Sequence, residues 1–336
     1  MPLPIIPNVL AVRFSSIGDI LLTTPLLRAI RRRHPDSRIT FVTKEEYVPL
    51  LSHNPHITRV IGFAADRPLH DLAVGLRQER YTHRLDLHGS LRSLALRALV
   101  PGGWSTYPKY RIARAMLIRS KRNYYRDHRS VAERYFAAAK HLDVLPDGGP
   151  PDFLLGPEAE RKASEWLAAS GLSPERPMVA LAPGAAHATK QWPLDHWYQL
   201  IGRITDAGYN GVIVGGPYDE TLGASLADRP GVASSAGRLG LQASAALLRR
   251  SVGVVSGDSG VMHMATAVGT PVVALFGPTV RAFGFAPYTS RAAIVELEMS
   301  CRPCSSQGGE RCPLGHHRCM IGIGPALVYD ALQRSV

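Results

Sequence analysis

Short hydrophobic runs that end in glycine-rich turns recur along the whole chain, and this rhythm constrains the fold more than any other feature. Runs of four to six apolar residues alternate with longer amphipathic segments, which is typical of α/β proteins with parallel sheets. The chain has 336 residues, of which 45% are hydrophobic, so it can bury two separate cores. We therefore predict two doubly wound α/β domains that face each other across a cleft.

The strands and helices can be placed approximately from these runs. Predicted strands are Val9–Phe14, Ile39–Thr43, Met178–Ala182, Gly211–Val214, Gly253–Ser256 and Pro271–Phe276, and predicted helices include Gly18–Arg33, Ser130–Leu142 and Pro193–Gly208. A proline- and glycine-rich linker at residues 147–151 separates the two sets. We predict an N-terminal domain over residues 1–150, a C-terminal domain over 151–320, and a C-terminal helix over 321–336 that packs back on the first domain.

Several protein classes are excluded by simple patterns. No apolar run approaches the roughly 20 residues that span a bilayer, and the N-terminus has no basic start and is interrupted by prolines. We therefore expect a cytoplasmic protein. Neither the dinucleotide glycine fingerprint nor the P-loop pattern occurs, which argues against an NAD enzyme or a P-loop ATPase.

The positive charge of the chain is unevenly distributed along the sequence. The formal net charge is +12, and residues 1–155 hold 24 Lys/Arg against 13 Asp/Glu, whereas residues 156–336 hold 15 against 14. The excess is densest between Lys109 and Arg134, where nine basic residues face two acids. Such a field attracts nucleic acid, an anionic membrane surface or an acidic substrate, although a solvated helix face gives the same pattern.

A serine- and glycine-containing turn, Ser15–Asp19, follows the first predicted strand. Glycine allows a ligand to approach the backbone, and the free amides of a helix start favour an anion. Asp19 would then lie where it can accept a proton from a substrate hydroxyl. The alternative is that Asp19 only caps its helix, which would stabilise it by about 1 kcal/mol.

The second half contains three comparable turns. Asp258 and the amides of Ser259 and Gly260 could hold sugar hydroxyls and a phosphate, with His263 one helical turn further on; a capped helix with a satisfied histidine is the alternative. Lys190 precedes a predicted helix start and could add positive charge there, or it could be an ordinary surface lysine. Glu220 follows a glycine turn and could bind a ribose.

All four cysteines lie within nineteen residues near the C-terminus. They are Cys301, Cys304, Cys312 and Cys319, and two histidines fall in the last interval. In a cytosolic chain this clustering favours coordination of a structural Zn²⁺ ion or an iron–sulfur cluster, with reduced thiols or labile disulfides as the alternatives. The position near the C-terminus, away from the glycine-rich turns, predicts a clip on an irregular loop over 301–319.

Six motifs together resemble glycosyltransferase family 9, the ADP-heptose:lipopolysaccharide heptosyltransferases of Gram-negative bacteria. They are residues 15–19, 86–89, 183–185, 190–193, 215–216 and 258–263 continued through 276–279, and they occur in the order seen in that family over roughly residues 8–330. The resemblance implies a GT-B fold of two Rossmann-like domains, with the acceptor bound to the first and the nucleotide sugar to the second.

The resemblance also implies roles for single residues. Asp19 would be the general base. Donor-binding residues would be Gly18, Lys190, Glu220, Asp258, Ser259, Gly260 and His263, and acceptor-binding residues would be His88, Arg92, Arg119, Lys121 and Arg122. Asp19 would deprotonate the acceptor hydroxyl, which displaces ADP with inversion and without a catalytic metal, while Lys190 and nearby amides stabilise the departing diphosphate.

The implied substrates are ADP-heptose and a phosphorylated lipid A–core precursor whose Kdo or heptose receives the sugar. The basic stretch would meet this acidic acceptor at the cytoplasmic side of the inner membrane, with which a monomeric enzyme would associate peripherally. Two other interpretations stay open. One is a family 9 transferase for another nucleotide sugar or acceptor, and the other is a basic protein that binds nucleic acid or an anionic surface, although no zinc-finger, RNA-recognition or helix-turn-helix motif supports nucleic acid.

Overall fold

The computed structural model describes residues 6–336, which form two compact α/β units. Unit 1 contains the described residues up to Lys109 together with Arg129–Leu154, and unit 2 contains Tyr110–His128 and Leu155–Val336. The predicted fold class, two doubly wound parallel-sheet domains, is confirmed. The division differs from a single boundary near residue 150, because the segment 110–128 packs with the second unit.

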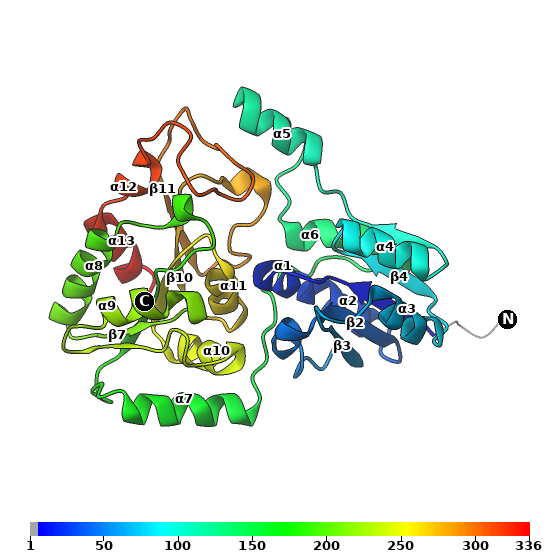
Figure 1. Ribbon diagram of the computed structural model, residues 1–336, viewed down its shortest axis with the longest axis horizontal. Coiled ribbons are helices and arrows are strands. Elements are labelled where there is room, and N and C mark those ends of the chain that lie inside the picture. The colour runs from blue at the N-terminus through cyan, green and yellow to red at the C-terminus, as the bar shows by residue number, and fades with distance from the viewer. Residues whose placement is uncertain (1–5) are drawn as a thin grey trace. The chain divides into compact units, whose positions relative to one another are not determined.

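Unit 1 is built on a five-stranded parallel sheet in the order β3-β2-β1-β4-β5 (Figure 1). Its strands are β1 Asn8–Val12, β2 Arg38–Lys44, β3 Arg59–Phe63, β4 His83–Asp86 and β5 Trp104–Thr106. The strand order reverses between β1 and β4. In open α/β sheets, ligands bind beyond the carboxyl ends of the strands at such a switch point, so the turns after β1 and β4 form the expected site of this unit.

Helices cover both faces of this sheet. They are α1 Ile17–Leu21, α2 Thr24–Arg33, α3 Leu69–Arg77, α4 Leu91–Leu99 and α6 Val131–Tyr135, with 3₁₀ helices η1 Glu45–Leu50 and η2 Phe136–Leu142. The single helix predicted over residues 18–33 is divided into α1 and α2. The break occurs because Pro25 has no N–H to continue the ladder and the Thr24 hydroxyl donates to the Leu21 carbonyl at 2.7 Å.

Unit 2 is built on a six-stranded parallel sheet in the order β11-β10-β9-β6-β7-β8. Its strands are β6 Met178–Ala182, β7 Asn210–Ile213, β8 Val232–Ser234, β9 Gly253–Gly257, β10 Val272–Phe276 and β11 Ala292–Glu296. When the strands of this sheet are numbered from one along the chain, their order is that of the Rossmann fold. The strand order reverses between β6 and β9. The turns after β6 and β9 are therefore the expected site of unit 2.

Most helices of unit 2 lie on the two faces of its sheet, whereas α5 Arg111–Ser120 stands apart from the sheet (Figure 1). The others are α7 Pro157–Ala169, α8 Leu194–Asp206, α9 Glu220–Leu226, α10 Leu241–Arg250, α11 Gly260–Ala267, α12 Arg318–Ile321 and α13 Pro325–Gln333, with 3₁₀ helices η3 Ala188–Lys190, η4 Pro217–Asp219 and η5 Arg281–Phe283. The C-terminal helix α13 packs on α8 and on strands β9 to β11 of its own unit, whereas the sequence predicts that it returns to the first domain. No described helix is long and apolar enough to cross a membrane.

Each unit has its own hydrophobic core, as the length of the chain predicts. In unit 1, buried side chains of the sheet such as Leu10 and Val42 pack with Leu76 and Leu96. In unit 2, Trp192 and Trp197 meet edge to face with ring centroids 5.0 Å apart inside a larger cluster. These cores hold the strand ends, and the turns that follow them, in fixed positions.

The placement of residues 110–128 changes the charge balance. This segment holds six basic residues and one acid. Unit 1 consequently holds 18 Lys/Arg against 12 Asp/Glu and unit 2 holds 21 against 15, so each carries +6. The asymmetry seen along the sequence therefore does not exist between the folded units, and nearly all the excess of unit 2 lies in this one segment.

Candidate functional site

The turn after β1 holds Asp19 in an ion pair. Asp19 is in the first turn of α1, and its Oδ1 lies 2.6 Å from a guanidinium nitrogen of Arg13, with 17% of the Asp19 side chain exposed. Its Oδ2 accepts hydrogen bonds from the Ser16 hydroxyl at 3.0 Å and from the Ser16 N–H at 3.4 Å. Asp19 thus caps its helix, and it also carries a carboxylate at the switch point of unit 1.

Arg13 is the residue that fixes this carboxylate, and sequence reasoning missed it. Arg13 is 6% exposed, and its guanidinium donates to the carbonyls of Ser15 and Leu87, each at 2.7 Å. Burial by itself lowers the pKa of Arg13. The nearby Tyr135, Asp19 and Tyr107 raise it by more than burial lowers it, so the pKa of Arg13 lies above its ordinary value. Arg13 is therefore a permanent cation that ties the turn after β1 to the turn after β4.

The turn after β4 is organised by a buried carboxylate. Asp86 has no exposed surface, and its Oδ1 accepts the N–H groups of His88 at 3.0 Å and Gly89 at 2.8 Å. Its Oδ2 accepts the Ser93 hydroxyl at 3.1 Å and lies 3.6 Å from Arg97. Asp86 accordingly positions His88; the motif 86–89 contains it, although only the histidine was predicted to be functional.

His88 is neutral and has a defined tautomer. Its Nδ1 accepts the backbone N–H of Phe14 at 3.1 Å, so the ring hydrogen of the neutral form is on Nε2. Burial, with the nearby charges of Arg13 and Lys109, lowers the pKa of His88 to about 4. At neutral pH the ring can donate a hydrogen bond through Nε2 without adding positive charge to the turn.

Arg92, the other predicted acceptor residue of unit 1, lies on α4 one turn beyond His88. Its guanidinium stacks over the rings of Phe14 and Phe63, with distances of 5.9 and 5.8 Å to the ring centroids, while its side chain stays exposed. Gly18, which the family resemblance assigns to the donor, is buried in α1 of this same unit. The structure therefore brings Gly18, Asp19, His88 and Arg92 together around the carboxyl ends of β1 and β4.

The switch point of unit 2 holds a second ion pair. Lys190 Nζ lies 2.7 Å from Asp258 Oδ2 and 3.1 Å from the Asp258 carbonyl, and the two side chains are 13% and 11% exposed. The Thr279 hydroxyl donates to the same Oδ2 at 2.7 Å. Three turns, after β6, β9 and β10, thus converge on one carboxylate, and Thr279 joins the predicted set from the last of the sequence motifs.

The start of α11 follows directly in the turn after β9. Ser259 is the residue before the helix, and its hydroxyl lies 3.0 Å from that of Ser256. Gly260 is the first helical residue, and His263, one turn on, is 4% exposed. The first N–H groups of α11 have no side-chain cap, and they follow Asp258 directly in sequence. Free amides at a helix start favour an anion, so this turn could bind one.

The glycine turn after β7 is held by Asp219, the residue before the predicted ribose-binding Glu220. The Asp219 carboxylate accepts the Gly216 N–H at 2.8 Å and fills the space that a Cβ on Gly184 or Gly215 would need. Glycine is required at both positions because any side chain would meet this carboxylate. Glu220 is the first residue of α9 and is exposed, and its role in binding ribose stays a prediction.

The cysteine loop contacts the site, contrary to its predicted place away from the glycine-rich turns. Thr189, beside Lys190, exchanges hydrogen bonds with Gly309 through both its backbone and its hydroxyl, at 2.8 to 3.0 Å. The His317 ring bonds to the Thr189 carbonyl at 2.8 Å, and the Cys304 N–H donates to the Pro278 carbonyl at 3.1 Å. The loop therefore supports two of the turns that converge on Asp258.

The four cysteines of this loop are free thiols. Within residues 6–336, no group of three or more histidine, cysteine or acidic side chains is arranged to hold a metal ion. The structural metal predicted at Cys301, Cys304, Cys312 and Cys319 therefore finds no support. Hydrogen bonds to Thr189 and Pro278 join the loop to the turns around it.

The predicted basic acceptor residues Arg119, Lys121 and Arg122 lie at the end of α5 in unit 2, not in the first domain. Lys121 ends the helix with a left-handed backbone (φ 59°), and its Nζ donates to the carbonyls of Ile118 and Pro303, each at 2.7 Å. Lys121 therefore has a structural role in joining α5 to the cysteine loop. Arg119 and Arg122 are exposed.

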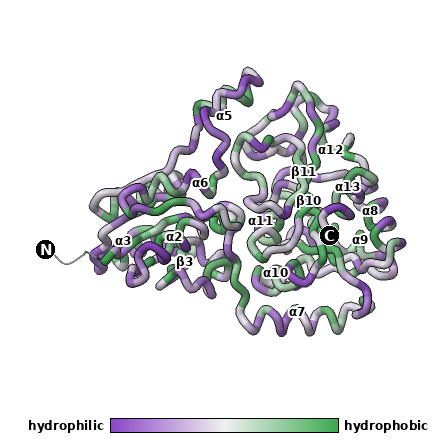
Figure 2. Tube along the Cα trace, turned by 180° about the vertical axis from the view of Figure 1, so that it is seen from behind, coloured by the Kyte–Doolittle hydropathy of each residue, from purple (hydrophilic) through white to green (hydrophobic). Residues whose placement is uncertain are grey.

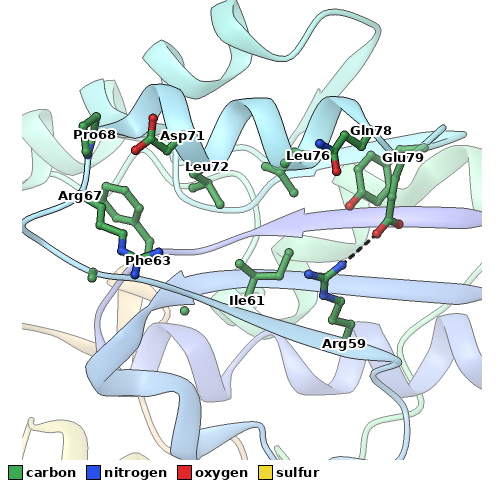
Figure 3. Close-up of a pocket in the computed structure, with 14 residues that line it drawn as sticks. Arg59, Ile61, Phe63, Arg67, Pro68, Asp71, Leu72, Leu76, Gln78 and Glu79 are labelled. Carbon is green, nitrogen blue, oxygen red and sulfur yellow. Dashed lines mark hydrogen bonds and ion pairs between the residues drawn. The ribbon is translucent and has the colours of Figure 1, made fainter.

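A separate pocket of about 270 Å³ lies between α3 and β3 in unit 1 (Figure 3). Apolar side chains such as Ile61 and Leu72 line it, and Arg59 and Glu79 form an ion pair of 3.1 Å at one end. None of the predicted site residues lines this pocket. The candidate site is therefore defined by the strand-end turns and not by this concavity.

Comparison with known proteins gives one consistent result. Residues 69–313 match the model of glycosyltransferase family 9 (heptosyltransferase). The chain is 26% identical to lipooligosaccharide heptosyltransferase 2 of Haemophilus influenzae, over 97% of this chain and 98% of that protein, and 27% identical to lipopolysaccharide heptosyltransferase 2 of Escherichia coli, over 97% of each. The crystal structure of a family 9 glycosyltransferase from Veillonella parvula has the same fold, with a TM-score of 0.81 at 22% identity over 98% of this chain and 96% of that one.

Proposed function

The chain belongs to glycosyltransferase family 9, and we propose that it is an inverting heptosyltransferase that moves heptose from ADP-heptose to the inner core of a lipopolysaccharide precursor. The heptosyltransferase relatives, which align over nearly the whole chain, support heptose as the transferred sugar. We place the reaction on the cytoplasmic side of the inner membrane.

The observation that carries the proposal is the Lys190–Asp258–Thr279 cluster at the switch point of unit 2. Three strand-end turns bring one cation, one carboxylate and one hydroxyl within 2.7 Å contacts, directly before the amides that open α11. A diphosphate needs the cation and the amides, and a sugar needs the carboxylate and the hydroxyl. The cluster has both sets, as a nucleotide-sugar site requires.

On the acceptor side, Asp19 supplies the base. Its carboxylate is oriented by Arg13 at 2.6 Å and by the hydroxyl and N–H of Ser16, and its side chain is 17% exposed beyond the carboxyl end of β1, where ligands of such sheets bind. The acceptor hydroxyl donates to Asp19 and loses its proton to it as the new glycosidic bond forms. His88, neutral and donating through Nε2, and the exposed Arg92 are suited to the hydroxyl and acidic groups of a Kdo-containing acceptor.

On the donor side, Lys190 and the α11 amides stabilise the leaving group. As the bond from the anomeric carbon to the diphosphate breaks, negative charge accumulates on the terminal phosphate oxygen, and fixed positive groups lower the energy of that state. The Asp258 carboxylate then accepts hydrogen bonds from hydroxyls of the sugar. The anomeric carbon of that sugar gains positive charge in the transition state. Displacement from the face opposite the diphosphate inverts that carbon.

The test is transfer from ADP-heptose to a Kdo-terminated lipid A precursor by Asp19→Asn. We expect kcat to fall by at least about a thousandfold, the size typical of losing a general base together with a positioned contact, while the Kd for ADP changes less than twofold. Asp66→Asn, at an exposed position of unit 1, is the matched control. An Asp19→Asn enzyme that keeps a tenth or more of its turnover contradicts the assignment.

Two further measurements address the donor and the metal. Thermal shift with ADP-, UDP- and GDP-sugars should show stabilisation by the ADP-sugar, since binding to the folded state alone raises the melting temperature; a stronger shift with another nucleotide would move the chain to a different donor. We expect turnover to be the same with EDTA as without it, because Lys190 and the amides of α11 supply the positive groups.

A further inference from the structure

A buried arginine of the cysteine loop holds the turn that follows β10. This arginine is Arg302, and its side chain is 6% exposed. Strand β10 is hydrophobic along its whole length and ends directly before the turn, which consists of residues 277–279 (Figure 2). All three residues of the turn are buried, so their backbone carbonyls need hydrogen-bond donors from within the protein.

The guanidinium of Arg302 bonds to both ends of this turn. Its Nε donates to the Gly277 carbonyl, and its Nη2 donates to the Thr279 carbonyl at 2.9 Å. The Nη2 atom also lies 2.7 Å from the Glu296 carboxylate, and Nη1 donates to the Leu297 carbonyl. The donors of arginine form a rigid planar fork, so the two carbonyls of the turn are held in a fixed relation to each other.

The side chain of Thr279 carries this constraint to the donor side of the site. Its hydroxyl donates to Asp258 Oδ2 at 2.7 Å, and the same oxygen lies 2.7 Å from Lys190 Nζ. A threonine side chain is stiff because it is branched at Cβ, so the direction of its hydroxyl follows from the position of its backbone. The influence of Arg302 on Asp258 therefore passes through the backbone of Thr279.

We propose that Arg302 is a positioning residue for the donor sugar. It acts through Thr279, whose hydroxyl orients the Asp258 carboxylate toward the hydroxyls of the sugar, as a supporting hydrogen bond does for a binding group. In the proposed function Asp258 binds the sugar and Lys190 the diphosphate, and the role of Arg302 rests on that assignment. Loss of Arg302 should consequently weaken binding of the sugar half of the donor and leave binding of ADP nearly unchanged.

Calorimetry of the whole protein with ADP and with ADP-heptose separates the two halves of the donor. Arg302→Met should raise the Kd for ADP-heptose about 10- to 100-fold, the range for one lost hydrogen bond to a charged group, and should change the Kd for ADP less than about threefold. Arg302→Lys keeps a charge beside Glu296 but cannot span both carbonyls, so its Kd for ADP-heptose should lie between those of the wild type and Arg302→Met. Thr279→Val should reproduce the effect of Arg302→Met, and the double variant should differ from it by less than about threefold, because both changes act on one hydroxyl.

The matched control is Arg281→Met. Arg281 pairs with the same Glu296 carboxylate at 2.7 Å, and its side chain is 56% exposed. We expect both Kd values of this variant to stay within about twofold of wild type. A loss of ADP-heptose affinity as large as that of Arg302→Met would overturn the proposal, because the ion pair and not the turn would then be responsible.

Urea unfolding of the same variants distinguishes positioning from a purely structural role. A structural role would lower the free energy of unfolding of Arg302→Met without changing the ratio of its two Kd values, and that result overturns the proposal. Effects of Arg302→Met and Thr279→Val that multiply also overturn it. If Arg302→Met does not fold, Arg302→Lys carries the test, and an unchanged Kd ratio there has the same meaning. Wild-type protein that binds no ADP-heptose overturns the proposed function as well, whereas each of the other results leaves that function standing.

Discussion

The Lys190–Asp258 ion pair allows a quantitative test of the donor-side assignment. The two charges are 2.7 Å apart, and each side chain has little more than a tenth of its surface exposed. The perturbation is a double-mutant cycle of Lys190→Gln, Asp258→Asn and the two together, with Lys162→Gln on the exposed face of α7 as control.

The size of the effect follows from the geometry. At an effective dielectric constant of 20, unit charges at this separation attract by about 6 kcal/mol before desolvation is subtracted. Breaking a fully buried pair by removing one partner costs about 3–5 kcal/mol, and the residual exposure of this pair reduces that to about 2–3 kcal/mol in the free energy of unfolding for each single variant. The double variant leaves no unpaired charge, so it should lower the free energy of unfolding by about as much as one single variant does. The two single effects together then exceed the double effect by about 2 kcal/mol, which is the coupling energy of the pair.

Binding of ADP separates the roles of the two partners. Lys190→Gln removes the cation and should weaken ADP binding about 30- to 100-fold, the range for a lost charged hydrogen bond. Asp258→Asn releases the ammonium from its carboxylate, so the affinity for ADP should stay equal or increase, while the affinity for the sugar half of the donor decreases. Urea unfolding gives the stability cycle and calorimetry gives the Kd values.

Two results would refute this reasoning. Additive unfolding free energies, with a coupling energy below about 0.5 kcal/mol, would mean that the contact contributes no stability. Wild-type ADP affinity in Lys190→Gln would mean that the diphosphate binds elsewhere. Lys162→Gln should leave the Kd for ADP unchanged and alter the free energy of unfolding by less than about 0.5 kcal/mol, because the ion pair of Lys162 with Glu158 is exposed.

Three further predictions concern the turns. His88 has a folded-state pKa of about 4, below its ordinary value of 6.5, so between these pH values the unfolded chain binds one more proton than the folded chain. The free energy of unfolding should therefore fall as pH decreases from about 6.5 to 4, by less than about 1.4 kcal/mol per pH unit because the ring is partly exposed. Urea titrations should show a smaller pH dependence for His88→Gln than for the wild type. Gly184→Ala should destabilise by about 1–3 kcal/mol through the Asp219 carboxylate, and thermal melts should show that the same change adds no cost in an Asp219→Ala background. Thr189→Val removes the hydroxyl bonds to Gly309, and steady-state kinetics should show a higher KM for the donor with the acceptor KM unchanged.

The sheets could be predicted from the sequence because their strands are buried on both faces. A strand covered on both sides is a continuous apolar run, so Met178–Ala182 was placed at its observed bounds, and the other named strands were displaced by only a few residues. The glycine turns then locate the carboxyl ends. Helix bounds were less accurate, since the break before Pro25 depends on a threonine side-chain bond that apolar periodicity does not report.

The residues that fix the site were harder to predict than those that face the ligand. Arg13 bonds to the carbonyl of Leu87, which is 74 residues away in sequence. Asp86 bonds to the N–H of Gly89 within its own motif. Neither residue is marked as buried by the composition around it. Segment 110–128 shows the same limit at the level of domains. Its membership of unit 2 depends on Leu117 and Tyr125 packing against Phe283, a contact over more than 150 residues of chain.

The cysteine loop shows why distance along the chain misleads in a doubly wound fold. In a parallel sheet every strand ends at the same edge, so a loop after β11 reaches the turns after β6 and β10 although 120 residues separate Thr189 from Gly309. Clustered cysteines suggested a metal clip remote from the chemistry, yet the loop holds the turn that carries Lys190. Any change that loosens this loop, whether substitution or oxidation of its thiols, should therefore act first on the affinity for the donor and only afterwards on the global stability of unit 2.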